Sequence, residues 1–301
     1  MTTATTDHAD PRRSLPVMAG MDRSRPIAAA QYFDFGAGPG TASEAGRTWT
    51  TRGQNAVVHY VAARAPGPIV DTRFASETAL VLTSDAAAVT VTWDGAATDA
   101  AGHGIVVIPP GAVRIDNAGT GDVVLLVRAD EPGWAERAAN AEAYAEPHPR
   151  VAPAEPWPEP VGAPRVRVYP AADHPISPER FGRIYRTRSF MINLLPEQDG
   201  PRDPAKLSPH HHDDFEQYSL ATGGTWVHHI RTPWLTDQAQ WREDEHVRMG
   251  SPSLAVIPPP TIHTSAGTSA GRNVLIDIFS PPREDFSAKA GWVLNAEDYP
   301  R

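Results

Sequence analysis

The stretch VIPPGAVR at Val107–Arg114 recurs as VIPPPTIH at Val256–His263. A second shared block follows each copy, NAGT from Asn117 in the first half and SAGT from Ser265 in the second. A β-branched run comes next in both halves, VVLLV in the first and VLIDI in the second. Three blocks in the same order and at nearly constant offset predict that the chain holds two copies of one β fold.

The segments around these blocks are also typical of β structure. The chain has 31 prolines and 23 glycines, and they separate short β-rich runs such as Ala56–Ala62, Ala87–Trp93 and Ile105–Ile108. Many short strands at regular spacing favour an all-β sandwich or barrel over a parallel α/β fold.

A proline-rich segment divides the two copies. Seven prolines fall between Pro147 and Pro164 and keep that segment extended, which predicts a domain linker. Just before it, the Ala- and Glu-rich stretch Gly133–Glu146 predicts a helix. The expected organisation is a mobile N-terminal arm at 1–26, a barrel at 27–130, a helix and linker at 131–164, and a second barrel at 165–301.

Composition excludes several classes of protein. The formal net charge of −9 repels nucleic-acid phosphates and anionic membranes, so neither is an expected partner. The absence of cysteine excludes disulfides, thiolate nucleophiles and Cys-based metal sites, so that any metal must bind His and carboxylate. No apolar stretch approaches the roughly 18 residues of a membrane span, and the expected location is the cytoplasm. The expected partner is a small-molecule substrate, with homo-oligomerisation left open.

The stretch PHHHDDFEQYSLATGG at Pro209–Gly224 holds the candidate ligands. Strand alternation predicts that His210, His212 and Glu216 lie on one face, and His263 on a distant strand supplies a fourth ligand. Such a set suits Fe(II), Mn(II), Ni(II) or Zn(II). The alternative is a solvated, histidine-rich loop that binds no metal.

The spacing of these residues resembles that of a known family. His210-x-His212-x3-Glu216-x6-Gly223 matches the first motif of the cupin superfamily, and Pro258-x-Pro260-x2-His263 resembles the second. Because both halves carry a copy of the repeated blocks, the chain resembles a bicupin, a cupin with two barrels. The resemblance implies two antiparallel jelly-roll barrels with inward-facing ligands. Because only the second half carries the ligand residues, one divalent metal per chain is expected, Fe(II) or Mn(II), with Ni(II) or Zn(II) as alternatives.

The first half lacks the metal motif. Aligning Glu77 with the motif glutamate puts Asp71 and Arg73 at the two histidine positions and Arg114 at the third. Arginine stays protonated and has no lone pair for a metal. The first barrel is therefore expected to be metal-free. Its arginines line either an anion-binding pocket or, as we expect, an ion-pair network with Asp71 and Glu77.

The second half carries extra residues between its motifs, within His228–Met249. A long loop rich in aromatic and charged residues beside a metal site predicts a substrate lid or specificity loop. Packing of its tryptophans at an interface is the alternative. The candidate substrate-binding residues are Arg231, Trp234 and Trp241, and the candidate acids or bases are Tyr218, His228 and His246.

These features predict a metal-dependent bicupin enzyme acting on a small organic molecule. A mixed His and carboxylate site with open positions suits Fe(II) and dioxygen, which favours dioxygenase chemistry. One alternative is an isomerase, lyase or hydrolase of a sugar acid or related carbonyl compound, in which the metal acts as a Lewis acid. The other is a non-catalytic binding or storage protein. A polar cavity with an inward acid or base favours an enzyme.

Overall fold

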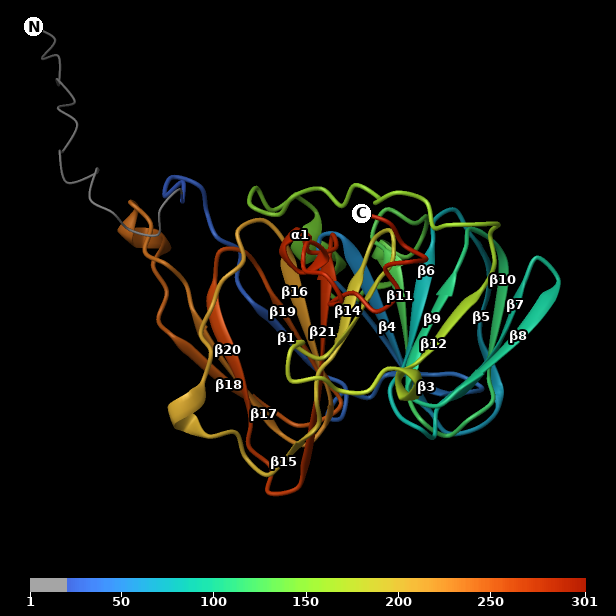
Figure 1. Ribbon diagram of the computed structural model, residues 1–301. Coiled ribbons are helices and arrows are strands. Elements are labelled where there is room, and N and C mark those ends of the chain that lie inside the picture. Colours follow the sequence, from blue (N-terminus) through green and yellow to red (C-terminus); the bar gives the residue numbers. More distant parts are fainter. Residues whose placement is uncertain (1–20) are drawn as a thin grey trace, which may run out of the picture.

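The computed structural model describes residues 21–301, so most of the predicted N-terminal arm lies outside the described residues. Figure 1 shows two barrels side by side, the first in cyan and green and the second in orange and red. Within 21–301 the chain is almost entirely antiparallel β structure with one short α-helix, α1 (Glu284–Ser287), which confirms the all-β prediction. No helix among the described residues is long and apolar enough to cross a membrane.

The first barrel packs a seven-stranded sheet against a four-stranded sheet. The larger sheet has the order β12 (Arg167–Pro170), β9 (Gly104–Ile108), β6 (Thr78–Leu82), β11 (Val123–Arg128), β4 (Ala56–Ala63), β3 (Gly46–Arg52) and β2 (Thr41–Ala42). The smaller sheet has the order β5 (Gly67–Phe74), β10 (Gly111–Asn117), β7 (Ala88–Trp93) and β8 (Ala96–Ala101). Apolar side chains such as Phe74, Leu80 and Val91 fill the space between the two sheets.

The second barrel repeats this design with a seven-stranded and a three-stranded sheet. The larger sheet has the order β1 (Gln31–Asp34), β19 (Ser253–Ile257), β16 (Glu216–Gly223), β21 (Arg272–Ser280), β14 (Met191–Leu194) and β13 (Arg183–Arg186), with β15 (Gln198–Asp199) pairing to β21. The smaller sheet has the order β18 (Glu245–Met249), β17 (Trp226–Arg231) and β20 (Ile262–Gly267).

The two large sheets pack face to face and share one apolar core. Alternate residues of β4 belong to different cores: Val57 faces the interior of the first barrel, and Val58 faces the shared core. Tyr218 and Ile276 reach the same shared core from the second barrel. Because strands in these sheets are buried on both faces, they appear in the sequence as continuous apolar runs.

Each barrel completes its large sheet with a strand from the other half of the chain. β1 pairs with β19 of the second barrel, and β12 pairs with β9 of the first. Residues 31–34 and 167–170 therefore lie across the boundaries expected from the sequence, as the blue β1 and the yellow-green β12 show in Figure 1. The exchange joins the barrels through backbone hydrogen bonds as well as through the shared core.

The predicted helix at Gly133–Glu146 is wrong. The segment forms two short 3₁₀ turns, η2 (Ala135–Arg137) and η3 (Ala141–Tyr144). Between them Asn140 accepts a hydrogen bond from the Arg52 amide at 2.9 Å and donates to the Arg52 carbonyl oxygen at 2.8 Å. Tertiary hydrogen bonds of this kind outweigh a weak local helix preference.

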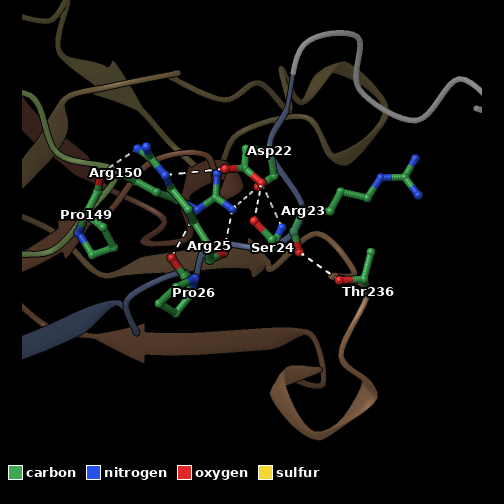
Figure 2. Close-up of polar contacts among 8 residues, drawn as sticks. All are labelled: Asp22, Arg23, Ser24, Arg25, Pro26, Pro149, Arg150 and Thr236. Carbon is green, nitrogen blue, oxygen red and sulfur yellow. Dashed lines mark hydrogen bonds and ion pairs between the residues drawn. The ribbon is translucent and has the colours of Figure 1, made fainter. Parts of the chain in front are cut away.

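The described end of the N-terminal segment is tied to the second half of the chain. Figure 2 shows the Arg150 guanidinium donating to backbone oxygens of Asp22, Arg25 and Pro26. The same view shows Thr236, in the long loop 232–244, donating to the Arg23 carbonyl oxygen.

The long loop 232–244 joins β17 to β18 in the second barrel. In the first barrel the corresponding strands β7 and β8 are joined by the tight turn Asp94–Gly95, whose φ angles of 43° and 86° suit a hairpin.

Candidate metal centre

Three imidazoles meet in the second barrel, those of His212 and His263 buried and that of His210 exposed. Among the described residues, His210, His212 and His263 form a group whose ligand atoms all lie within 4.8 Å of one another. His263 lies on β20, and its backbone forms a two-hydrogen-bond bridge with His210, at 2.7 and 3.1 Å. Three of the four sequence-predicted ligands are therefore brought together.

Hydrogen bonds on the outer nitrogens set which lone pairs face the centre. The Nδ1 atoms of His210 and His263 each lie 2.9 Å from a backbone carbonyl oxygen, those of Ser208 and Thr261. A carbonyl oxygen can only accept, so each Nδ1 carries the proton and each Nε2 offers a lone pair. Burial lowers the pKa of His263 to about 3, which keeps this imidazole neutral at pH 7.

Gln217 contributes an oxygen to the same point. Its Oε1 lies 2.8 Å from His212 Nε2 and 3.2 Å from His263 Nε2. Its amide nitrogen donates to Ser219 Oγ at 2.8 Å and to Asp277 Oδ1 at 3.1 Å, which fixes the orientation of the amide. Oε1 and the His263 lone pair thus face each other without a proton between them, an arrangement that suits a bound cation.

Glu216 does not belong to this group, so its predicted role as a ligand is wrong. Its carboxylate turns to the opposite face of β16. There it accepts hydrogen bonds from the backbone amide of Gln54 at 2.7 Å, the Tyr218 hydroxyl at 2.9 Å and the Tyr144 hydroxyl at 3.1 Å. Residues 211–215 lie outside any strand, so strand alternation does not carry from His212 to Glu216.

Sequence reasoning missed Gln217, although a signal for it was present. The cupin motif allows three or four residues between its second histidine and its acid, and the four-residue spacing ends on Gln217. Because neighbouring strand residues face opposite sides, choosing the three-residue spacing moved the ligand to the wrong face.

A cavity of about 250 Å³ opens beside the imidazoles, lined by His210, His263 and Gln217 and by the charged side chains Arg180, Arg202 and Asp277. Arg202 is held at the cavity wall by the Ser265 carbonyl oxygen at 2.9 Å and by Ser208 Oγ at 3.0 Å. Asp277 is buried and accepts from Ser219 Oγ at 2.7 Å, and burial raises its pKa to about 6. The candidate metal centre thus faces a cavity of mixed lining, in which these charged groups lie beside apolar side chains such as Phe181, Trp226 and Leu275.

The three candidate acids or bases lie in different places. His228 points into the second barrel: its side chain is fully buried, its Nδ1 lies 2.8 Å from Ser265 Oγ, and its buried Nε2 has no hydrogen-bond partner. Tyr218 lies in the shared core, and His246 lies on the outer face, where its Nδ1 is 2.8 Å from that of His229. Of the three, His228 is the one inside the barrel.

The candidate substrate-binding residues of the loop are at the surface. Arg231 pairs with Asp244, whose carboxylate oxygens lie 3.0 Å from Arg231 Nε. Trp234 and Trp241 stack on each other with ring centroids 4.4 Å apart, and they are 65% and 39% exposed. None of these three described side chains lines the metal cavity. Control of substrate entry by this loop stays a prediction.

The first barrel places apolar or small side chains where the second places ligands. Thr72 lies opposite Val113 in the strand pairing, as His210 lies opposite His263, and Val91 lies opposite Ile115, as His228 lies opposite Ser265. By this register the positions of His210, His212, Gln217 and His263 correspond to Thr72, Phe74, Thr78 and Val113.

The alignment that placed Asp71, Arg73 and Arg114 inside the first barrel is therefore wrong. All three are exposed on the outer face of β5 and β10. The turn after the VIPP block differs in length between the halves, and a shift of one residue moves every side chain of a strand to the other face. Arg114 does form ion pairs, with Asp116 at 2.7 Å and Asp71 at 3.3 Å, but they lie on the outer surface.

Comparison with solved structures supports the architecture. The chain is similar to an oxalate decarboxylase variant of B. subtilis, at 14% identity and a TM-score of 0.58 over 85% of this chain and 78% of that chain. It is also similar to a formate complex of the Lactobacillus farciminis oxalate decarboxylase, at 13% identity and a TM-score of 0.55 over 84% and 86%. No family model matches the chain, and no curated protein matches its sequence. The likeness shows the fold, which is the two-barrel cupin fold predicted from the sequence.

Proposed function

We infer that the protein is a metal-dependent lyase that cleaves a carbon–carbon bond in a small carboxylate. The observation that carries this proposal is the meeting of His210, His212 and His263 beside a cavity that also holds arginine. Two structures of similar fold are oxalate decarboxylases, one of them with formate, which supports small carboxylates as the substrate class.

The three imidazoles and the oxygen of Gln217 would hold one divalent ion. Imidazole suits Fe(II) and amide oxygen suits Mn(II), and these two ions remain the expected cofactors. When bound, such an ion polarises carboxylate oxygens as a Lewis acid. Asp277 and Ser219 hold the amide of Gln217 so that its oxygen keeps facing the imidazoles.

Arg202 is the residue that binds the substrate carboxylate in this proposal. Three hydrogen bonds occupy its Nη atoms, which leaves two of the five guanidinium N–H groups for an anion. A guanidinium pairs well with a carboxylate, especially when the surrounding protein holds it in place. The unpartnered Nε2 of His228 offers a further hydrogen bond to a ligand inside the barrel.

The earlier preference for dioxygenase chemistry loses its basis. It rested on a carboxylate among the metal ligands, and Glu216 faces away from the imidazoles. A passive binding role is disfavoured for another reason. Passive binding predicts a cavity lined by apolar side chains alone, whereas this one also holds two arginines, two amides and a carboxyl group.

Release of carbon dioxide tests the proposal. The Mn(II)-loaded and Fe(II)-loaded protein is incubated with oxalate and other two- to four-carbon carboxylates. We expect carbon dioxide from at least one of them, and we expect His263→Ala and Arg202→Ala to reduce its release to background. A loaded protein that releases none contradicts the proposal, and substrate-dependent oxygen uptake would restore the dioxygenase alternative.

A further inference from the structure

A buried carboxylate links the first barrel to the strand that carries Gln217. Glu216 is fully buried at the start of β16. The Gln54 amide and the Tyr144 hydroxyl, which hydrogen-bond to it at 2.7 and 3.1 Å, both belong to the first half of the chain. Gln54 lies in the turn between β3 and β4, and Tyr144 lies in η3 after the last strand of that half.

The second half holds a matching carboxylate of the first barrel in the same way. Glu77 directly precedes β6 and is 5% exposed. It accepts from the Arg188 amide at 2.8 Å, in the turn between β13 and β14, and from the Tyr299 hydroxyl at 2.9 Å, after the last strand of the second half. Each barrel thus clamps a glutamate of the other.

The two clamps differ in what lies on the other face of the strand. The residue after Glu216 is Gln217, whose oxygen contacts His212 and His263. The residue after Glu77 is Thr78, which faces the apolar interior of the first barrel. The same device therefore adjoins the metal centre in one barrel and only apolar packing in the other.

We propose that the first barrel serves as a positioning element for the metal centre of the second. The Tyr144 hydroxyl and the Gln54 backbone amide hold Glu216 and so fix the start of β16. Gln217, the next residue, therefore keeps its oxygen against the imidazoles. The preceding residues 211–215 are outside any strand, so the regular pairing of β16 with its neighbours begins only at Glu216 and Gln217. Tyr144 and Glu216 are positioning residues. The inference rests on the metal centre proposed above.

The matched clamps supply the experiment. Tyr144→Phe and Tyr299→Phe each remove one hydroxyl from one buried carboxylate. Because Glu216 keeps the Tyr218 hydroxyl, Tyr299→Phe is expected to lower the melting temperature at least as much as Tyr144→Phe. Mn(II) affinity is measured on the full chain by electron paramagnetic resonance of the free ion. We expect Tyr144→Phe to weaken Mn(II) binding by up to about 10-fold, the lower end of the cost of losing a group that bonds a ligand directly, because Tyr144 acts on Gln217 only through Glu216. Tyr299→Phe is expected to bind as the wild type does.

Each of the other possible outcomes contradicts the positioning role. Wild-type affinity in both variants, or equal weakening in both, overturns the positioning role but leaves the metal centre standing. A wild type that binds no Mn(II) overturns the metal centre and this inference together. If Tyr144→Phe does not fold, Glu216→Gln and its match Glu77→Gln repeat the comparison, and the same difference between the two is expected.

Discussion

The two barrels share their frame and differ in what points inward. In the first barrel β6 directs Thr78, Leu80 and Leu82 into the interior, and in the second β16 directs Gln217, Ser219 and Ala221 to the same places. The strand pairings and the glutamate clamps are common to both. The comparison teaches that one frame can enclose two different interiors, and that the candidate metal site uses the inward positions of one copy only.

The difference in the interiors also has an energetic side. An apolar interior stabilises a barrel by removing hydrocarbon from water, and a polar one does so only where its groups find partners. The first interior holds side chains such as Leu125 and Val127, whereas the second holds Asp277 and the unpartnered His228 nitrogen. The first interior therefore gains mainly from apolar burial, whereas that of the second depends on hydrogen bonds such as those to Asp277.

The largest effect is expected from removing an imidazole. The wild type should carry one tightly bound ion per chain, and His212→Ala should lower its metal affinity by more than about 100-fold, because a ligand counts for more than a supporting group. Metal content after dialysis, measured by mass spectrometry, checks this.

A control change in the apolar interior of the first barrel is Leu80→Ala, at the position that corresponds to Ser219 of the second. It should cost about 2–5 kcal/mol of stability through a cavity and leave the metal content unchanged. Full metal occupancy in His212→Ala, or metal loss in Leu80→Ala, would contradict the claim that only the second barrel binds the metal.

The next effect is the contribution of His228 to the pH dependence of stability, in addition to that of His59 in the first half, whose pKa burial also lowers to about 4. Burial lowers the pKa of His228 to about 4, below the usual value near 6.5, so the folded state prefers the neutral imidazole. Its contribution to stability is complete above pH 6.5 and is lost as the pH falls toward 4. At pH 5 the loss is about 2 kcal/mol, from 1.36 kcal/mol per pKa unit.

Denaturant unfolding at pH 7 and pH 5 measures this loss. In His228→Asn the difference between the two pH values should shrink by about 2 kcal/mol, since asparagine does not titrate in this range. Val91 occupies the matching position in the first barrel, and Val91→Ala should leave the pH difference as it is in the wild type. An unchanged difference in His228→Asn would show that this imidazole is not held neutral.

The sequence predicted the repeated fold and three of the imidazoles because those features are periodic or carry a motif. The block repeat predicted two copies of one β fold, and the resemblance to cupins implied that each copy is a barrel. His210, His212 and His263 followed from spacing, and the structure brings them together. These predictions needed only local pattern.

The wrong predictions concern residues for which a shift of one residue in strand register decides whether the side chain faces the barrel interior. Glu216 and Gln217 are neighbours, and only the irregular segment before β16 determines which of them meets the imidazoles. Arg114 was misplaced in the same way by a turn of different length. The failed helix at 133–146 depended on the distant backbone of Arg52, which no local pattern contains. Faces and long-range hydrogen bonds are set by the packed structure rather than by spacing.

A smaller effect is expected from the loop that only the second barrel carries. If residues 232–244 control entry to the metal cavity, deletion of Thr236–Gln240 should change kcat/KM of the proposed reaction while metal content stays unchanged. The stacked Trp234 and Trp241 should report substrate binding as a change in fluorescence. Unaltered kcat and KM after the deletion would leave the loop as surface packing.

The smallest effect belongs to Arg114, and it tests the register of the first barrel directly. Its side chain is 47% exposed and pairs with Asp116 and Asp71 on the outer surface, where such ion pairs contribute about 0–1 kcal/mol. An arginine buried in the barrel among acidic partners would cost about 3–5 kcal/mol when removed, because its partners would be left as unpaired buried charges. Arg114→Ala should therefore change the free energy of unfolding by less than about 1 kcal/mol. For the same reason Arg114→His should add no second metal, since the new imidazole would lie outside the barrel. A loss of several kcal/mol, or a second bound ion, would show that Arg114 lies in the barrel interior. The alignment that matches Arg114 with His263 would then be correct.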